Sequence, residues 1–132
     1  MFKKFDINFD SSGNGLLGYF EFDDLPFTPQ RAYWLSKVAI HSSRGMHAHK
    51  NLSQLFINLS GSFDLTLDDG SERLVLGMKN SGEAILLKPG LWRELRNFSK
   101  NSLVFVLCDQ KFSEDDYIRD YSNFLKWKNS NQ

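Results

Sequence analysis

The heptapeptide Arg-Gly-Met-His-Ala-His-Lys at residues 44–50 decides how the rest of the chain is interpreted. Its two histidines, His47 and His49, are two positions apart. Side chains at that spacing on a β-strand point to the same face, so both imidazoles are expected to enter one space just after a glycine. Imidazole has the ordinary pKa nearest neutrality, which suits either proton transfer or metal binding. The stretch therefore predicts a strand that carries a chemically active histidine pair.

The residues around this pair resemble the two cupin motifs. The first cupin motif is a glycine, a His-x-His pair, a glutamate and a closing glycine; here Gly45 and Gly61 stand at the ends and Gln54 takes the glutamate position. The second motif has a Pro-Gly turn followed by a third histidine. Here Pro89-Gly90 supplies the turn, and Arg93 stands near the histidine position.

This set of side chains makes a poor metal site. Zinc, iron and manganese sites use three or four histidine, cysteine or carboxylate ligands. Two histidines remain, but an amide replaces the carboxylate at Gln54 and a cation is added at Arg93. The sequence therefore predicts no metal and no other cofactor, and it favours proton transfer.

Length and composition indicate one domain over residues 1–132. The 16 Lys and Arg residues balance 16 Asp and Glu residues, so no basic field argues for nucleic acid. The one cysteine, Cys108, excludes an internal disulfide framework and favours a reducing cytoplasm. The start has no signal-peptide core, and no apolar run is long enough for a membrane span.

Most of the chain has the pattern of short strands separated by turns. Residues 54–59 alternate between the two faces of a strand, with Gln54, Phe56 and Asn58 expected to face inward. Because His49 and Gln54 are an odd step apart, the chain must bend between them for both to share that face. Asp69-Gly70 predicts a two-residue type I′ hairpin turn. Eight to ten such strands predict an all-β fold, a cupin jelly-roll barrel.

Two segments differ from the pattern of half-exposed strands. Residues 31–40 alternate imperfectly, which is typical of a strand covered on both faces. Residues 113–116, Ser-Glu-Asp-Asp, resemble a helix N-terminus. Apolar and aromatic residues then recur from Tyr117 to Trp127 at helical spacing. The barrel is therefore expected to carry a short C-terminal helical segment that docks on it.

Taken together, these residues resemble the nucleotide-sugar 3,4-ketoisomerases, the WxcM-like branch of the cupins. The likeness covers about residues 15–125. Its specific strings are Pro26-Phe27, residues 31–33 (Arg-Ala-Tyr), residues 44–50, residues 58–62 (Asn-Leu-Ser-Gly-Ser), residues 67–70 (Leu-Asp-Asp-Gly), residues 92–94 (Trp-Arg-Glu), residues 97–99 (Asn-Phe-Ser), residues 116–121 (Asp-Tyr-Ile-Arg-Asp-Tyr) and Asn123-Phe124.

The resemblance implies an activity and an assembly. Such enzymes convert dTDP-4-keto-6-deoxyglucose into the 3-keto sugar, on the way to 3-amino-3,6-dideoxyhexoses of bacterial surface glycans such as the lipopolysaccharide O-antigen. They require no metal, and they form homodimers that exchange N-terminal strands. We therefore expect a dTDP-linked 4-keto-6-deoxy sugar as the partner of this chain. We also expect residues 1–30 to pair with the barrel of a second copy.

The chemistry assigns roles to the candidate residues. Moving a carbonyl from C4 to C3 needs a base at C3 and donors for the enediolate oxygen. The expected catalytic residues are His47, His49 and Tyr33, with either histidine as the base. The expected substrate-binding residues are Arg44, Arg31, Gln54, Trp92 and Arg93, with Trp92 stacking on the thymine or the sugar.

Three alternatives share the same fold. A sugar-nucleotide 3,5-epimerase also removes a proton beside a ketone, and a metal-dependent cupin such as a dioxygenase uses the same barrel. A non-catalytic sugar-binding cupin would bind without turnover. The position of solvent deuterium in the product separates the epimerase from the ketoisomerase, metal analysis identifies the dioxygenase, and turnover excludes the binding protein.

Overall fold

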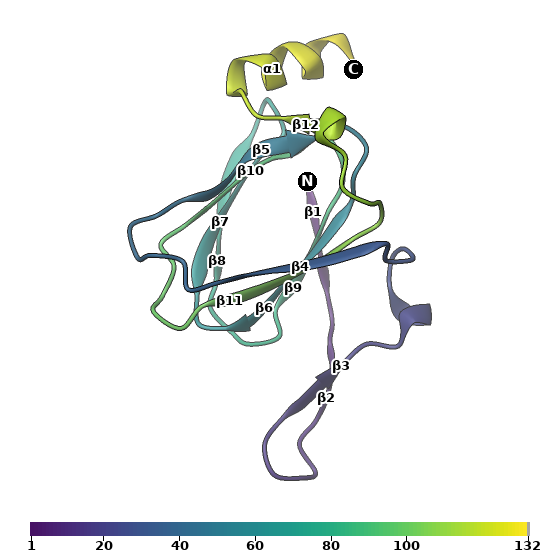
Figure 1. The fold of residues 1–132 in the computed structure, drawn as a ribbon, viewed down its shortest axis with the longest axis vertical. Coiled ribbons are helices and arrows are strands. Elements are labelled where there is room, and N and C mark those ends of the chain that lie inside the picture. Colours follow the sequence, from purple (N-terminus) through teal and green to yellow (C-terminus); the bar gives the residue numbers. More distant parts are fainter. Residues whose placement is uncertain (132) are drawn as a thin grey trace.

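A computed structural model describes residues 1–131 as two five-stranded antiparallel sheets that face each other (Figure 1). The first, named the β6 sheet, has the spatial order β1 (Phe2–Phe5), β9 (Ala84–Leu87), β6 (Gln54–Ser60), β11 (Leu103–Cys108), β4 (Arg31–Ser36). The second, named the β10 sheet, has the order β12 (Tyr117–Ile118), β5 (Arg44–His49), β10 (Trp92–Arg96), β7 (Phe63–Asp68), β8 (Arg73–Met78). These strands confirm the predicted all-β cupin barrel.

The core fills the space between the two sheets. Phe56 from β6, Leu65 from β7 and Val106 from β11 are all buried there, at positions that alternate along their strands. The neighbours Leu55 and Ile57 point to the outer face of the β6 sheet. This alternation confirms the pattern predicted for residues 54–59.

The predicted bend after the histidine pair is a crossing between sheets. β5 ends at His49 in the β10 sheet, and β6 begins at Gln54 in the β6 sheet. His49 and Gln54 therefore enter the interior from opposite walls, and both are fully buried. The odd step along the chain is absorbed by this change of sheet.

The N-terminal segment lies outside the barrel. β1 pairs with β9 of its own chain, and the apolar side chains that follow it cover the outer face of the β6 sheet. β2 (Asn8–Asp10) and β3 (Leu17–Tyr19) pair with each other as a hairpin that projects away from the barrel (Figure 1). The short 3₁₀ helix η1 (Phe22–Asp24) then leads toward β4. The expectation of partner pairing therefore does not extend to residues 2–5, which occupy their own sheet edge.

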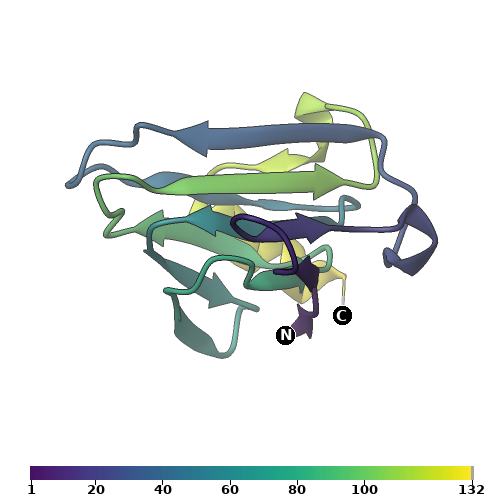
Figure 2. The ribbon, with the colours of Figure 1, turned by 90° about the horizontal axis from the view of Figure 1, so that it is seen from below.

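The strand expected to be covered on both faces is an edge strand with one open face. β4 pairs only with β11 in the described part of the chain, and it forms the outer border of the β6 sheet (Figure 2). Its inward side chains are half-buried, whereas Trp34 on the outer side is 63% exposed. The imperfect alternation therefore does not indicate a strand covered on both faces, because no element in residues 1–131 covers Trp34.

The C-terminal segment departs from the predicted helix start. Residues Glu114–Asp116 form a single 3₁₀ turn, η2, and Tyr117–Ile118 form β12, which pairs with β5. The helix α1 (Tyr121–Ser130) begins after Asp120, whose carboxylate accepts a hydrogen bond from the Asn123 N–H. α1 packs on the β10 sheet as predicted, through Phe124. In residues 1–131, no helix is long and apolar enough to span a bilayer.

The hairpin between β7 and β8 has a longer loop than predicted. Asp68 pairs with Arg73, so four residues connect the strands. The Asp69 carboxylate accepts hydrogen bonds from the N–H groups of Ser71 and Glu72, at 2.9 and 2.8 Å. These side-chain bonds make an Asx-type turn beside a backbone hydrogen bond of 3.1 Å from the Asp69 N–H to the Glu72 carbonyl oxygen, so the turn is not the two-residue turn centred on Asp69-Gly70.

Candidate active site

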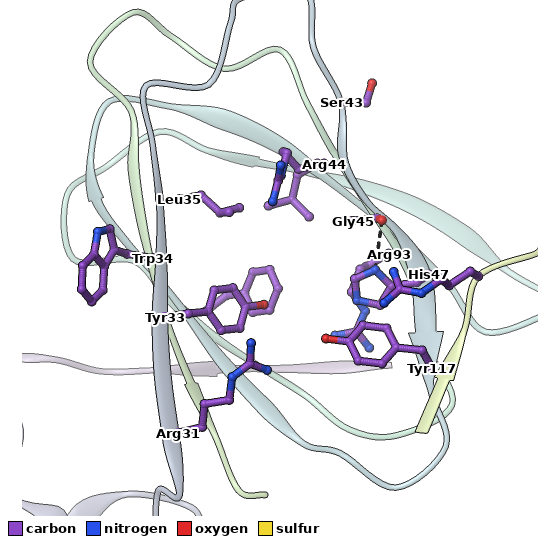
Figure 3. Close-up of a pocket in the computed structure, with 13 residues that line it drawn as sticks. Arg31, Tyr33, Trp34, Leu35, Ser43, Arg44, Gly45, His47, Arg93 and Tyr117 are labelled. Carbon is purple, nitrogen blue, oxygen red and sulfur yellow. Dashed lines mark hydrogen bonds between the residues drawn. The ribbon is translucent and has the colours of Figure 1, made fainter. Parts of the chain in front are cut away.

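A cavity of about 480 Å³ opens between β4 and β5 at one end of the barrel (Figure 3). This volume is in the range of pockets that bind small molecules. Its polar lining comes from β4, β5, β10 and the β12 region: Arg31, Tyr33, Ser43, Arg44, His47, Arg93, Tyr117 and Arg119. The cavity therefore brings together most of the residues predicted from the sequence.

A bulge in β5 shapes the wall that carries the histidines. Gly45 and Met46 both have left-handed backbone conformations, with φ of 83° and 59°. They lie where the pairing of β5 with β10 shifts register beside Arg93. A Cβ atom at Gly45 would come within 3.0 Å of the Arg93 carbonyl oxygen, so glycine is required there. The bulge turns the Gly45 carbonyl toward His47, whose Nδ1 lies 2.9 Å from the oxygen.

The two imidazoles contact each other directly. Nε2 of His47 and Nε2 of His49 are 3.1 Å apart, and the rings meet edge to face with centroids 4.8 Å apart. His47 lines the cavity, whereas His49 lies behind it and is completely buried. His47 is therefore the histidine that can reach a bound molecule.

A carboxylate stands behind His49. Oδ2 of Asp116 is 3.0 Å from Nδ1 of His49, and Oδ1 of Asp116 accepts a hydrogen bond of 2.7 Å from the Asn51 N–H. Tyr117 packs on both imidazoles, with centroids 4.9 Å from His47 and 4.4 Å from His49. These contacts hold both rings in place on the sides that face away from the cavity.

Burial keeps the histidines neutral. Burial first, and the positive charge of Arg93 second, lower the pKa of His47 to about 4. The same two causes lower the pKa of His49 well below its ordinary value. A neutral imidazole can accept a proton, so His47 has the protonation state of a base near neutral pH.

Arg93 is a buried cation without an anionic partner. Its side chain is fully buried, and burial lowers its pKa to about 10, so it keeps its charge near neutral pH. It donates hydrogen bonds only to neutral oxygens, the Gln54 side-chain carbonyl and the Leu91 backbone carbonyl, and its Nε has no partner in the described chain. Buried charges are costly unless they are paired, so this guanidinium is positioned to receive an anion in the cavity.

Tyr33 and Gln54 form the wall opposite the histidines. Gln54 Nε2 donates to the Tyr33 hydroxyl oxygen at 3.1 Å, so the hydroxyl proton remains available to the cavity. Burial raises the pKa of Tyr33 to about 12, so the hydroxyl is a donor and not a base. Both ends of the Gln54 amide are occupied, by Tyr33 and Arg93. Gln54 therefore supports two lining residues and does not itself face the cavity.

Three arginines stand at the cavity mouth. Arg44 and Arg119 are exposed, and Arg31 is half-buried with its guanidinium 4.9 Å from the Tyr33 ring centroid. Arg119 lies over the Tyr117 ring at 4.1 Å and pairs with Glu114 at 2.8 Å. The mouth therefore carries positive charge suited to phosphate groups.

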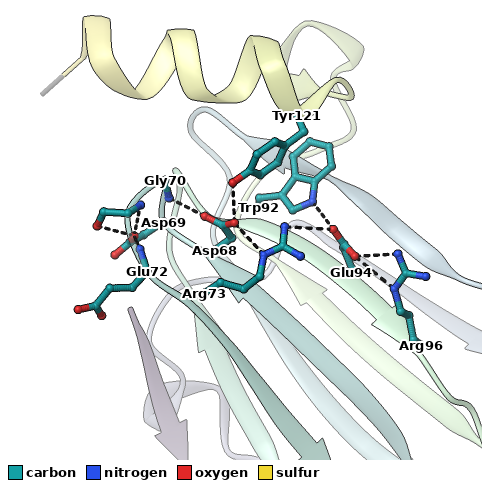
Figure 4. A network of polar contacts seen from close by, with 10 residues as sticks. Asp68, Asp69, Gly70, Glu72, Arg73, Trp92, Glu94, Arg96 and Tyr121 are labelled. Carbon is teal, nitrogen blue, oxygen red and sulfur yellow. Dashed lines mark hydrogen bonds and ion pairs between the residues drawn. The ribbon is translucent and has the colours of Figure 1, made fainter.

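The structure contradicts the role predicted for Trp92. This side chain is 3% exposed and packs under α1 on the outer side of β10, where its Nε1–H donates to Glu94 at 2.9 Å (Figure 4). Neighbouring strand residues face opposite sides, and Arg93 faces inward. Trp92 therefore cannot stack on a molecule bound in the cavity.

Sequence analysis missed three residues of the site. The sequence pattern predicts a helix start at Asp116 and a helical stripe from Tyr117, whereas both residues contact the histidine pair. Arg119 was not assigned any role, yet it lines the cavity. The available signal was the Asp-Tyr-Ile-Arg string itself, which belongs to the family likeness.

The residues present do not fit a bound metal. Among residues 1–131, no group of three or more histidine, cysteine or carboxylate side chains has a metal-binding arrangement. The side chain that faces the histidines from β10 is the Arg93 guanidinium, which repels a cation. The donor set therefore suits anionic intermediates better than a divalent ion.

Comparison with known proteins shows the family to which the chain belongs. The family described as FdtA, WxcM-like, C-terminal matches residues 2–129. The chain belongs to this family. It is 34% identical over 125 residues to the TDP-4-oxo-6-deoxy-α-D-glucose-3,4-oxoisomerase of Aneurinibacillus thermoaerophilus, covering 92% of this chain and 89% of that protein.

Solved structures agree with this assignment. The 3,4-ketoisomerase of Helicobacter canadensis has a TM-score of 0.92 and 31% identity, with 97% of each chain covered. QdtA of Thermoanaerobacterium thermosaccharolyticum, a sugar 3,4-ketoisomerase solved in complex with TDP, has a TM-score of 0.93 and 27% identity, covering 98% of this chain and 96% of that chain. A histidine-to-asparagine variant of QdtA was solved with TDP-4-keto-6-deoxyglucose.

Proposed function

We propose that this chain is a nucleotide-sugar 3,4-ketoisomerase that moves the keto group of a TDP-4-keto-6-deoxy sugar from C4 to C3. Family membership and the activities of its relatives support this function. The observation that carries it at the site is the pairing of His47 with Arg93. These two are opposite residues on neighbouring strands, and they place a neutral base beside an unpaired cation in one cavity.

The arrangement suits proton transfer through an enediol. His47 removes the proton from C3, the electrons of that C–H bond form a C3–C4 double bond, and the C4 carbonyl oxygen takes up the negative charge. Arg93 and the Tyr33 hydroxyl donate hydrogen bonds to that oxygen. The C4 oxygen takes up a proton, which gives the enediol. The O3 hydroxyl then loses its proton while C4 gains a proton, and the carbonyl is left at C3. The two electrons stay within the sugar, so the step uses no hydride carrier.

The cavity mouth suits the nucleotide half of the substrate. A TDP-sugar carries two phosphates next to the sugar, and Arg31, Arg44 and Arg119 surround the opening through which they would pass. Guanidinium groups bind phosphate oxygens through two parallel hydrogen bonds. We therefore assign these three arginines to the diphosphate, and Tyr33, His47 and Arg93 to the sugar.

Incubation with TDP-4-keto-6-deoxyglucose in deuterium oxide tests this function. We expect NMR to show a 3-keto product with deuterium at C4. Deuterium incorporated beside a retained C4 ketone would assign the chain to the epimerases. An unchanged substrate that still binds would make it a binding protein.

We also propose a biosynthetic place and a cellular compartment. A carbonyl at C3 is the group that a transaminase converts into an amine, so the product suits synthesis of 3-amino-3,6-dideoxy sugars for bacterial surface glycans. The buried free thiol of Cys108 is compatible with the reducing cytoplasm, where we place the enzyme. An aminotransferase assay coupled to the purified product tests the first point, and fractionation of the source cells tests the second.

We propose a homodimer in which the β2–β3 hairpin exchanges between subunits. The hairpin exposes Leu16, Leu17 and Tyr19, and the outer edge of β4 exposes Trp34 and unpaired backbone groups. Adding a strand to such an edge satisfies its hydrogen bonds and covers its apolar side chains. Deletion of residues 8–20 should give a monomeric or insoluble protein. A native chain that sediments as a compact, active monomer at micromolar concentration would refute the dimer.

A further inference from the structure

Each of the two histidine rings has a hydrogen-bond partner at its Nδ1 atom. Nδ1 of His47 faces the Gly45 carbonyl oxygen at 2.9 Å, and Nδ1 of His49 faces the Asp116 carboxylate at 3.0 Å. A carbonyl oxygen carries no proton, so Nδ1 of His47 must carry the proton of the first contact. The Asn51 N–H donates to the other Asp116 oxygen, which supports the carboxylate as the acceptor in the second contact.

These contacts decide where the lone pairs lie. A neutral imidazole with its proton on Nδ1 has an unprotonated Nε2. Both Nε2 atoms are then unprotonated acceptors that lie 3.1 Å apart, in rings that meet edge to face. Two lone pairs at this distance repel, and a proton placed between them converts the repulsion into a hydrogen bond. The pair therefore has a higher affinity for one proton than either imidazole would have alone.

We infer that His47, His49 and Asp116 act as a single base, in which the proton taken from the sugar is shared between the two Nε2 atoms and Asp116 holds His49 in the tautomer that makes sharing possible. The inference rests on the proposed ketoisomerase function. Nε2 of His47 forms the new N–H bond as the C3–H bond breaks. Nε2 of His49 then accepts a hydrogen bond from this N–H group. Asp116 touches no substrate and is a positioning residue.

Other charges around the pair set the strength of this base. Burial and Arg93 lower the pKa of both histidines, which opposes the effect of the converging lone pairs and of Asp116. The remaining charged or titratable groups that face the pair come from β4, η2 and the β12 region: Arg31, Tyr33, Glu114, Tyr117 and Arg119. The converging lone pairs and Asp116 favour uptake of the proton, and Arg93 favours its release, so the base can be regenerated after each turnover.

Nitrogen-15 NMR of the histidine rings in the ligand-free wild type tests the inference directly. We expect both His47 and His49 to carry their proton on Nδ1 in the neutral state. On acidification, both Nε2 signals should move together, with one midpoint and uptake of one proton. His41, exposed in a loop, is the internal reference for an independent histidine. A proton on Nε2 of either residue in the neutral state, or two separate midpoints, would overturn the inference.

Two variants distinguish a positioning role of Asp116 from a purely structural role. Asp116→Asn removes the charge behind His49, so the shared midpoint should move to lower pH. The acidic limb of the kcat profile should follow it by the same amount, and kcat should fall about tenfold with little change in KM. Asp115→Asn, the exposed neighbour, should change neither property. A lower kcat with an unmoved midpoint would reduce Asp116 to a structural residue and contradict the inference.

The two proposals fail in different experiments. A shared proton in a protein that does not turn over the keto sugar would leave the single base standing and refute the ketoisomerase. Turnover by a protein whose histidines titrate separately would refute the single base and leave the ketoisomerase standing.

Discussion

Arg93 and Glu94 are neighbours on β10, and their surroundings differ completely. Arg93 faces the cavity, is fully buried and has no anionic partner in residues 1–131. Glu94 faces the opposite side and is surrounded by donors: Trp92 at 2.9 Å, Arg96 at 2.9 Å and Arg73 at 3.5 Å (Figure 4). One face of the strand holds a charge that lacks a partner, and the other face holds a charge whose bonds are satisfied.

The outer cluster has the properties of a structural network. Asp68 accepts hydrogen bonds from the Tyr121 hydroxyl at 2.7 Å and from Arg73 at 3.0 Å, which ties α1 to the β10 sheet. Burial alone would raise the pKa of the Glu94 carboxyl, but the hydrogen bonds from Trp92 and Arg96 lower it overall. Satisfied charges of this kind stabilise a fold, whereas an unsatisfied buried cation costs stability and is a candidate for binding or catalysis. The comparison predicts that inner substitutions affect turnover and outer substitutions affect stability.

The largest effect is expected at the base. His47→Asn should lower turnover on the order of 10²-fold or more, because the asparagine amide cannot accept the proton from C3. His49→Asn should cause a smaller loss, since His49 does not reach the cavity. Steady-state kinetics with TDP-4-keto-6-deoxyglucose measure both, and His41→Asn in the exposed loop is the control. Full activity in both variants would remove the pair from the mechanism.

An outer substitution should show the opposite profile. Glu94→Gln removes the charge that Arg73 and Arg96 share, so the free energy of unfolding should fall by about 2 kcal/mol. Its kcat should stay within a factor of about two of wild type, because Glu94 does not face the cavity. Urea unfolding measures the stability, with Glu72→Gln at an exposed position as the matched control. A large loss of kcat in the folded variant would contradict the division between the two faces.

Acid should weaken the fold through the histidine pair before the carboxylates titrate. The pKa of His47 is about 4 in the folded protein, and the unfolded value is about 6.5, so the unfolded chain binds more protons as the pH falls below 6.5. The contribution of neutral His47 is fully present above that pH. Between pH 6.5 and 5, the free energy of unfolding should fall by up to about 1.4 kcal/mol per pH unit. His47→Asn should flatten this slope, and a flat wild-type profile would show that the histidines are not held neutral.

Removal of metal should have the smallest effect. Because the donor set does not fit a divalent ion, exhaustive chelation should leave kcat unchanged. Metal analysis by mass spectrometry of the treated protein provides the check. A stoichiometric transition metal whose removal abolishes turnover would revive the metal-dependent cupin alternative.

The sequence predicts the positions of several residues of this candidate site, for identifiable physical reasons. His47 and His49 follow from strand periodicity, and the positions of Gln54 and Arg93 follow from the cupin motifs. The error at Trp92 was avoidable, because a residue next to an inward-facing Arg93 must face outward. The Asp-Gly turn failed because the Asp69 side chain bonds the loop itself, which a dipeptide pattern does not reveal.

Other features depend on contacts distant in sequence. Asp116 contacts His49 across 67 positions, through the pairing of β12 with β5. Met46 adopts a left-handed conformation that its residue type does not favour, and the register shift beside β10 imposes it. No local pattern predicts either feature, although both position the histidine pair.

The most direct test of the division between the two faces is a pair of arginine substitutions on one strand. Arg93→Met removes the inner cation, and Arg96→Met removes an outer cation that pairs with Glu94. For Arg93→Met we expect kcat to fall by about 10²-fold to 10³-fold, the usual cost of losing an oxyanion donor, while the protein stays folded. Arg96→Met should keep kcat near the wild-type value. Near-normal kcat in Arg93→Met would contradict the claim that the unpaired guanidinium stabilises the enediolate, and so would an equal loss in both variants.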